Sequence, residues 1–250
     1  YMPEIASALD IYADEMTTHS ALQPMLNIKC SNDEIKQVLH VLYHNIMNVN
    51  FNLFGWSRTM CKYGDYFLYL DIDETQGITN VIGLPAAEVE RLEGEDKTNP
   101  NYVQFQWNSA GMTFENWQMA HFRILGNDKY APYGTSVLEA ARRIWRQLTL
   151  MEDAMMAYRI VRAPERRIFY VDVGAIPPNE VEIDHVKYLR DKLFSALKIP
   201  AFYLTQGEGA TEDKTTLSQK DIRFARTIQR LQRAVISELE KIGIVHLYCL

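Results

Sequence analysis

A helical pattern without proline or glycine runs from Ser136 to about Arg162. Roughly 27 residues at about 1.5 Å rise make a rod about 40 Å long, which exceeds a typical globular helix. The pattern stops where Ala163 precedes Pro164, because a residue before proline avoids the helical region. The apolar positions expected on its buried face are Val137, Ile144, Leu148, Met151, Met155 and Tyr158.

Helical spacing predicts further helices at residues 4 to 18, 32 to 48, 186 to 198 and 217 to 241. In the last of these, one face is apolar and the opposite face is basic. The apolar face consists of Phe224, Ile228, Leu231 and Val235, and the basic face of Arg223, Arg226, Arg230 and Arg233. The helix is therefore expected to be amphipathic.

The texture changes between Phe51 and about Ala120, where short aromatic and branched segments alternate with glycines and prolines. Such a pattern predicts a β-rich region. Residues 66 to 72 and 78 to 84 are expected to form a hairpin, since the loop between them ends in the glycine that such loops favour. Residues 105 to 107 add another strand. Together with the long α-helices, this region indicates an α+β fold.

The charge is distributed unevenly. Residues 1 to 120 hold 6 Lys and Arg against 16 Asp and Glu, and residues 121 to 250 hold 20 against 16, giving about −10 and +4 within a net charge of −6. An acidic chain is a poor candidate for a free nucleic-acid binder, which gains affinity from a basic footprint. Such a chain can still surround DNA without binding it tightly.

The cellular compartment is indicated by three isolated cysteines and by the lack of a long apolar run. Cys30, Cys61 and Cys249 have no CxxC spacing, which favours a reducing compartment and argues against a structural zinc site. No run approaches the roughly 18 apolar residues of a membrane span, and the acidic start is unlike a signal peptide. We expect a soluble protein made in a cytoplasm, and both ends resemble cuts through a longer chain.

One motif points to catalysis. Residues 70 to 75 read LDIDET, and a strand followed by DxDxT is typical of haloacid-dehalogenase-like phosphatases. There Asp71 would attack phosphorus and Asp73 would handle the leaving-group proton, with magnesium offsetting the charge. The expected hairpin context argues against this alternative, because acids beside a turn glycine are more often solvated.

Other catalytic and cofactor signals are weak. His40 and His44 are four residues apart on a helix, but the Glu of HExxH and a third ligand are missing. No GxxxxGK[ST], GxGxxG or GxSxG pattern occurs, so we expect no enzyme, no cofactor and no small-molecule substrate. A helical scaffold or adaptor that binds only protein remains a further alternative.

A basic cluster lies around the end of the long helix, and it has two interpretations. Its arginines could complement the helix dipole locally, or they could pair bidentately with carboxylates of a neighbouring subunit. The residues are Arg159, Arg162, Arg166 and Arg167. Both interpretations stay open, and the second makes these residues candidates for a subunit interface.

The segment from residue 120 to residue 174, with RIVRAPERR near its end, resembles the portal proteins of contractile-tailed bacteriophages. IASALDIYADE at residues 5 to 15 and NFNLFGWSRTMCKYGDYFLYLDID at residues 50 to 73 are also similar to that family. VKYLRDKLFSALKIPAFYL, a polar loop and LSQKDIRFARTIQRLQ follow in the family's order. The resemblance covers most of the chain and implies a ring-forming phage portal fold.

The resemblance also implies a domain order. Residues 1 to 174, including the helix at 136 to 162, correspond to the wing, residues 175 to 205 to the stem region, and residues 217 to 250 to the start of the crown side. The loop at 206 to 216 corresponds to a tunnel loop, with channel residues Gly207, Glu208, Gly209, Thr211, Lys214 and Thr215. The family has a clip where this chain runs on almost directly, so we expect residues to be missing between Glu182 and Ile183.

By the same resemblance, the function is that of a DNA channel at one capsid vertex, active in head assembly, genome packaging and ejection, and neck and tail attachment. The implied assembly is a homo-oligomeric ring, usually of twelve subunits, around double-stranded DNA. Its partners would be the major capsid protein, the packaging motor (the large terminase) and neck or connector proteins. The implied location is the virion, at the capsid portal vertex.

Overall fold

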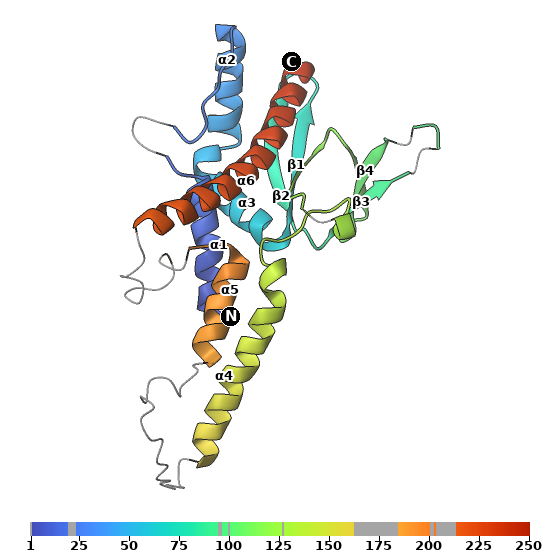
Figure 1. The fold of residues 1–250 in the computed structure, drawn as a ribbon. Helices are drawn as coiled ribbons and strands as arrows, with labels where there is room; N and C mark the ends of the chain where they lie inside the picture. Colours follow the sequence, from blue (N-terminus) through green and yellow to red (C-terminus); the bar gives the residue numbers. More distant parts are fainter. Residues whose placement is uncertain are drawn as a thin grey trace, which may run out of the picture. The chain divides into compact units, whose positions relative to one another are not determined.

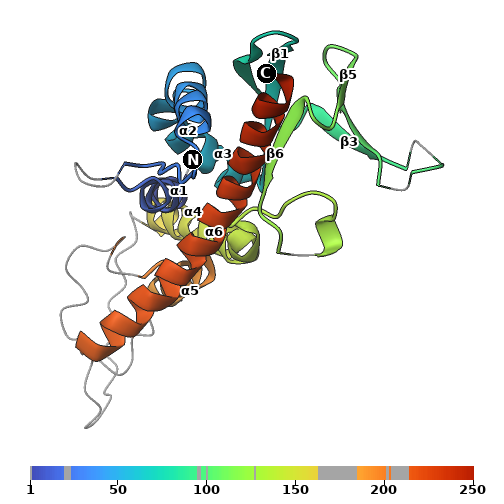
Figure 2. The same ribbon diagram turned by 90° about the horizontal axis from the view of Figure 1, so that it is seen from above.

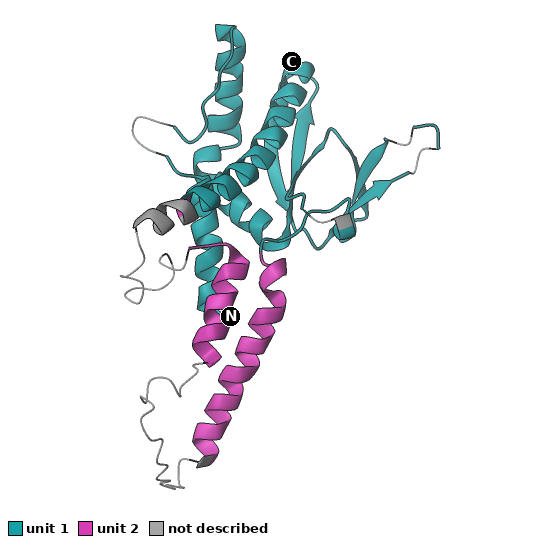
Figure 3. Ribbon diagram, in the orientation of Figure 1, with its two compact units in different colours: residues 1–137, 222–250 teal, residues 138–221 magenta. Residues whose placement is uncertain are grey.

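The computed structural model of the chain describes residues 2–19, 24–94, 97–99, 101–126, 128–162, 185–200, 203 and 214–250. They form two compact units, coloured separately in Figure 3. Unit 1 comprises Tyr1–Val137 and Ile222–Leu250, and unit 2 comprises Leu138–Asp221. The division between the two units falls at Leu138.

Unit 1 begins with helices. They are α1 (Pro3–Met16), α2 (Asp33–His40), the π-helix η1 (Val41–Ile46) and α3 (Val49–Tyr63). The side chain of Asn32 accepts a hydrogen bond from the backbone N–H of Glu34 at 2.9 Å and so caps α2. α3 packs against α1 and ends at Gly64, whose φ of 94° suits glycine.

The β-structure predicted from Phe51 onward is wrong up to Tyr63, which belongs to α3. Residues buried in this stretch recur every three or four positions, which is the spacing of a helix. They are Leu53, Ser57, Met60 and Cys61. The aromatic content of the stretch suggested strands, but tertiary packing on α1 outweighs that propensity.

Two antiparallel three-stranded sheets follow. The first has the order β2-β1-β6, with β1 at Asp65–Asp73, β2 at Gly77–Leu84 and β6 at Met119–Arg123. The second has the order β3-β4-β5, with β3 at Val89–Glu93, β4 at Val103–Trp107 and β5 at Met112–Glu115. The predicted hairpin and the predicted strand at 105 to 107 are both confirmed. The α+β fold class is therefore confirmed as well.

A shared core joins the two sheets. Phe67 from β1 and Phe105 from β4 meet edge to face, with ring centroids 5.9 Å apart. The buried residues of this cluster are Phe67, Leu84, Val89, Phe105, Phe114 and Met119. The sheets thus cover one another's apolar faces.

The helix α6 (Lys214–Cys249) begins and ends beyond the predicted bounds of 217 and 241. Its predicted apolar face is confirmed, since Phe224, Ile228, Leu231 and Val235 are buried. The hydroxyl of Tyr43 donates to the carbonyl of Leu239 at 2.6 Å, which attaches α6 to η1. The C-terminal end of α6 lies beside the β1–β2 hairpin in Figure 1 and again in the view of Figure 2.

Unit 2 contains the 3-10 helix η3 (Glu139–Ala141), α4 (Arg142–Arg162) and α5 (His185–Leu197). α4 packs against α5, which buries Leu193, Phe194 and Leu197. The buried stripe predicted for α4 is wrong at its far end, because Met155 and Tyr158 are 40% and 57% exposed. The predicted break at 182/183 lies outside the described residues.

Among the described helices, none combines the length and apolar character that crossing a membrane requires.

Candidate functional site

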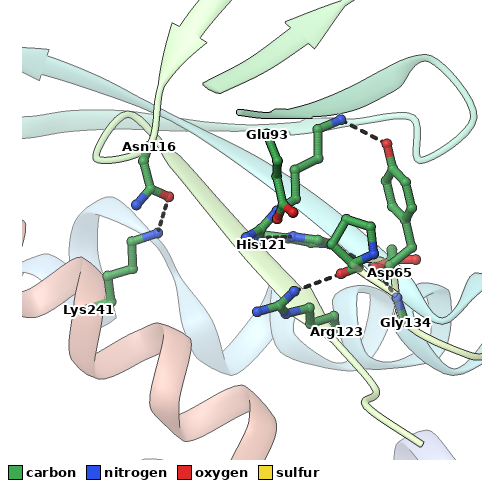
Figure 4. Close-up of polar contacts among 10 residues, drawn as sticks. Asp65, Glu93, Asn116, His121, Arg123, Gly134 and Lys241 are labelled. Carbon is green, nitrogen blue, oxygen red and sulfur yellow. Dashed lines mark hydrogen bonds and ion pairs between the residues drawn. The ribbon is translucent and has the colours of Figure 1, made fainter. Parts of the chain in front are cut away.

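The most extensive buried polar contacts in unit 1 centre on Asp65 and His121, shown in Figure 4. Nε2 of His121 lies 2.7 Å from Oδ1 of Asp65. The two residues are diagonal neighbours on adjacent strands, because Asp65 pairs with Arg123 and His121 pairs with Phe67. Their side chains are only 10% and 3% exposed, so solvent contributes little to the pair.

The imidazole of His121 is also held by aromatic rings from both sheets. It stacks on Phe67, with centroids 4.4 Å apart, and meets Phe105 edge-on at 5.7 Å. Burial lowers the pKa of His121, although the carboxylate of Asp65 opposes that shift. A neutral ring donates from Nε2 to Asp65 and leaves Nδ1 as an acceptor, facing Nη1 of Arg91 at 3.5 Å.

Asp65 also holds the loop that follows β6, since its Oδ1 accepts a hydrogen bond from the backbone N–H of Gly134 at 2.8 Å. Nearby, Arg123 donates to the carbonyl of Pro132 at 2.7 Å. A Cβ on Gly134 would lie 2.1 Å from the carbonyl oxygen of Gly64, so only glycine fits there. The carboxylate therefore fixes a close backbone crossing.

The contacts of His121 point to a structural role for this arrangement. A histidine acting as a general base needs one nitrogen free to take a proton from a nucleophile or from water. Both ring nitrogens of His121 face protein groups, Asp65 on one side and Arg91 on the other. The pair therefore has the geometry of a buried joint between strands and loop.

A second contact group connects α6 to β6. Nζ of Lys241 donates to the side-chain oxygen of Asn116 at 3.4 Å (Figure 4). It also donates to the carbonyl of Met119 at 3.1 Å. Glu238 accepts a hydrogen bond from the backbone N–H of His121 at 3.3 Å. Burial lowers the pKa of Lys241, and the neighbouring Glu238 opposes the shift. These contacts fix α6 against the edge of the first sheet.

The sequence analysis missed Asp65, His121 and Lys241. The available signal was their polarity within apolar elements, since Asp65 opens a buried strand and His121 interrupts the apolar run of β6. A buried polar residue in such a position needs a partner. The partner itself was not readable, because it lies 56 residues away in the chain.

The phosphatase motif does not have the context that its chemistry requires. β1, which carries Asp71 and Asp73, pairs antiparallel with β2 and β6, and it does not open a βαβ unit. Oδ1 of Asp73 accepts hydrogen bonds from the N–H and the hydroxyl of Thr75, at 2.8 and 2.6 Å. The hydroxyl and amide bonds to Thr75 hold the pKa of Asp73 below its usual value. The carboxylate thus shapes an exposed turn.

The two histidines considered as a metal face have rings 4.3 Å apart, with His40 at the end of α2 and His44 in η1. Burial first, and then the neighbouring His40, lower the pKa of His44. Within the described residues, no group of three or more potential metal ligands comes together.

The residues predicted for the interface and the channel are only partly described. Arg159 is exposed near the end of α4, and Arg162 is the last residue of that helix. Lys214 and Thr215 belong to the first turn of α6, so the helix includes the end of the predicted loop. The remaining predicted residues lie outside the described ranges, namely Arg166, Arg167, Gly207, Glu208, Gly209 and Thr211.

The fold resembles proteins from the necks of phage-like particles. The chain superposes on a protein of the virion of the native gene transfer agent particle with a TM-score of 0.60 at 10% identity, covering 96% of this chain and 78% of that one. A protein from the neck of the native particle, computed with C12 symmetry, gives 0.59 at 10% identity, with 96% and 77% covered. The fold is therefore of the phage portal and neck class.

The sequence identifies the family. The family described as bacteriophage T4-like portal protein (Gp20) matches residues 1–182 and 179–244. The chain belongs to this family, and the resemblance found from its motifs is confirmed.

Two curated relatives are both portal proteins. That of Vibrio phage KVP40 is 41% identical over 63 residues, which are 25% of this chain and 12% of the relative. That of Salmonella phage ViI is 23% identical over 336 residues, covering 92% of this chain and 60% of the relative. The chain thus spans less than two thirds of either relative.

Proposed function

We propose that this chain is part of a portal protein, which forms the ring-shaped DNA channel at one capsid vertex. Such a ring would serve head assembly, genome packaging and ejection, and the attachment of neck and tail. The observation that carries the proposal is the family match, which extends over nearly the whole chain. The fold shared with virion and neck proteins is independent support, because those proteins are only 10% identical in sequence and the likeness therefore lies in the structure.

The proposed assembly is a ring, with twelve copies as the expected number. The C12 symmetry of the related neck structure supports that number for this family of folds. The proposed partners are double-stranded DNA, the major capsid protein, the large terminase and neck or connector proteins. The protein would act without catalysis and reside in the virion, since a separate motor would drive the DNA.

The proposed domain order follows the resemblance, with wing, stem, tunnel loop and crown side in sequence. A clip missing near Glu182 fits two features of the comparisons. The family match is divided into two segments that overlap only at residues 179–182. The alignment with the relative from Salmonella phage ViI spans 336 positions although this chain has 250 residues, so that relative carries additional sequence.

Light scattering and electron microscopy of the full-length protein test the function directly. We expect a single large closed ring at moderate salt. A homogeneous monomer under those conditions would exclude a conduit, since a channel cannot form from one copy.

The predicted tunnel loop has its own test. Residues 206 to 216 include Glu208, Glu212 and Asp213 against Lys214, which suits weak contact with passing DNA, because a strongly basic collar would hold a duplex. Removing Gly207 to Ala210 should leave ring assembly intact and reduce packaging or retention of DNA. Normal genome filling by the shortened protein would make the loop a simple connection.

The arginine cluster is a candidate for the lateral contacts of the ring. Arg159 is exposed, as such a contact requires. Guanidinium groups pair well with carboxylates across interfaces. Replacing Arg159, Arg162, Arg166 and Arg167 by Gln should weaken the ring more at low salt than at high salt, because salt already screens these ion pairs in the unchanged protein. Unchanged assembly would leave the local interpretation, in which they complement the helix dipole.

A further inference from the structure

Four arginines form a continuous stripe on the surface of α6. Arg223, Arg226, Arg230 and Arg233 lie within an arc of about 80° at 3.6 residues per turn, and all four are exposed. Residues 222 to 237 contain these four arginines and no acidic residue. Within the described part of the chain, none of the four makes an ion pair. We call this surface the arginine stripe.

An oppositely charged surface lies elsewhere in the same unit. Residues 63 to 90 contain six acidic residues and neither lysine nor arginine. Three of the acids, Asp71, Asp73 and Glu74, are exposed where β1 turns into β2. We call this surface the acidic turn.

The two surfaces are held apart within one copy. The hairpin attaches to the C-terminal end of α6, because the backbone N–H of Ile78 donates to Nδ1 of His246 at 3.0 Å. A Cβ on Gly77 would lie 2.6 Å from the same nitrogen, so the approach is close. Arg230 lies sixteen residues before His246 on the continuous helix α6, which corresponds to about 24 Å along the axis.

We propose that the arginine stripe of one copy binds the acidic turn of the next copy in the ring. The inference rests on the proposed ring. A closed ring of identical subunits uses a head-to-tail interface, which requires two different, complementary patches on each copy. The stripe and the turn meet that requirement, because they have opposite charge and are separated along one helix, with the stripe near its middle and the turn attached at its C-terminal end. Arginine also suits bidentate pairing with carboxylates.

DNA is the other polyanion that the arginine stripe could bind. A duplex carries about one charge per 1.7 Å, and each phosphate contact strengthens its binding. Four arginines from every copy of a ring would hold a duplex that has to slide. A channel through which DNA slides is therefore more compatible with an arginine stripe that binds protein than with one that binds DNA.

Charge reversal on each surface tests the pairing. The stripe variant is Arg226→Glu/Arg230→Glu, and the turn variant is Asp71→Lys/Glu74→Lys in the full-length protein. Asp73 is left in place because its carboxylate accepts the hydrogen bonds from Thr75 that shape the turn. A matched control, Lys36→Glu/Lys97→Glu, changes two exposed cations elsewhere in unit 1.

Each variant alone should form at least about tenfold less ring by mass, because like charges across an interface oppose association. An equimolar mixture should recover rings, since the two introduced glutamates of one copy can face the two introduced lysines of the next copy in an alternating ring. The control should assemble as the unchanged protein does. Circular dichroism on each variant separates misfolding from lost pairing, and the recovery in the mixture itself requires folded copies.

Three results would overturn the inference. Folded variants that assemble normally, or a mixture without recovery, would mean that the two surfaces do not meet. Intact rings of the stripe variant that have lost retention of a short DNA duplex would assign the stripe to DNA. In each case the unchanged protein still forms rings, so the proposed function survives. If the unchanged protein forms no ring, the proposed function fails first.

Discussion

The two units of the chain differ in how much of their apolar surface they cover themselves. Unit 1 buries aromatic residues between two sheets and satisfies the buried carboxylate of Asp65 with His121 and Gly134. In unit 2, α4 carries large apolar side chains that are exposed on all sides of the helix. They are Leu150, Met155, Met156, Tyr158, Ile160 and Val161. Exposed apolar surface of this kind is typical of interaction sites, so unit 1 has the properties of a self-sufficient domain and we expect unit 2 to act as an assembly element.

The largest effect should come from the core of unit 1. Phe105 is fully buried between the sheets, and Phe105→Ala should lower the free energy of unfolding by about 3–5 kcal/mol through lost burial and a cavity. Denaturant unfolding followed by circular dichroism measures the change. The matched control is Phe51→Ala, because the Phe51 side chain is 78% exposed. Equal effects of the two substitutions would contradict the self-sufficient core.

The next effect concerns the buried carboxylate. Asp65→Ala leaves the Nε2–H of His121 and the N–H of Gly134 without their acceptor, which should cost about 1–3 kcal/mol of stability. Thermal unfolding of this variant is compared with that of Asp14→Ala, which removes an exposed carboxylate from α1. If the two variants have the same melting temperature, Asp65 is not essential to the close approach of Gly134 to Gly64 at the end of α3.

A pH dependence should follow from His121. Burial lowers its pKa in the folded protein below the ordinary value of 6.5, so the unfolded chain binds the proton more readily. The stability of unit 1 should be complete above about pH 6.5 and should decrease as the pH falls below that value, by at most about 1.4 kcal/mol per pH unit for one histidine. Melting temperatures between pH 7.5 and pH 5.5 measure the slope.

A second buried histidine contributes to the same dependence of stability on pH. Burial also lowers the pKa of His246, which adds to the slope in the same direction. His121→Gln should reduce the slope and His246→Gln should remove a separate part of it. A melting temperature that rises on acidification would contradict the prediction.

The smallest effect on the isolated chain should come from α4. Leu150 and Ile160 are each 69% exposed, so Leu150→Ser/Ile160→Ser should change the free energy of unfolding by no more than about 0.5 kcal/mol. The same variant should reduce ring formation if α4 is an assembly element. Leu148→Ser, at a buried neighbouring position, should destabilise the unit itself. A large loss of monomer stability from the exposed pair would remove the contrast between the units.

The elements predicted correctly are those whose pattern is local. The apolar spacing of Phe224, Ile228 and Leu231 predicted the buried face of α6, and Gly77 marked the hairpin. α3 was assigned to β-structure because its aromatic content was considered before its spacing. The predicted burial of Met155 and Tyr158 on α4 was wrong for a different reason. Apolar spacing shows that a helix has a face suited to burial, but it does not show whether another element covers that face.

The sequence by itself determined the family, the α+β class and most of the helices and strands, because these depend on motifs and periodicities among residues close in the chain. Only the tertiary structure decided that Asp65 meets His121, that Lys241 contacts the strand of Met119, and that the acidic turn attaches to the far end of the helix bearing the arginine stripe. Those contacts join residues far apart in sequence. They depend on the strand register and on how the helix lies across the sheet, which no local pattern encodes.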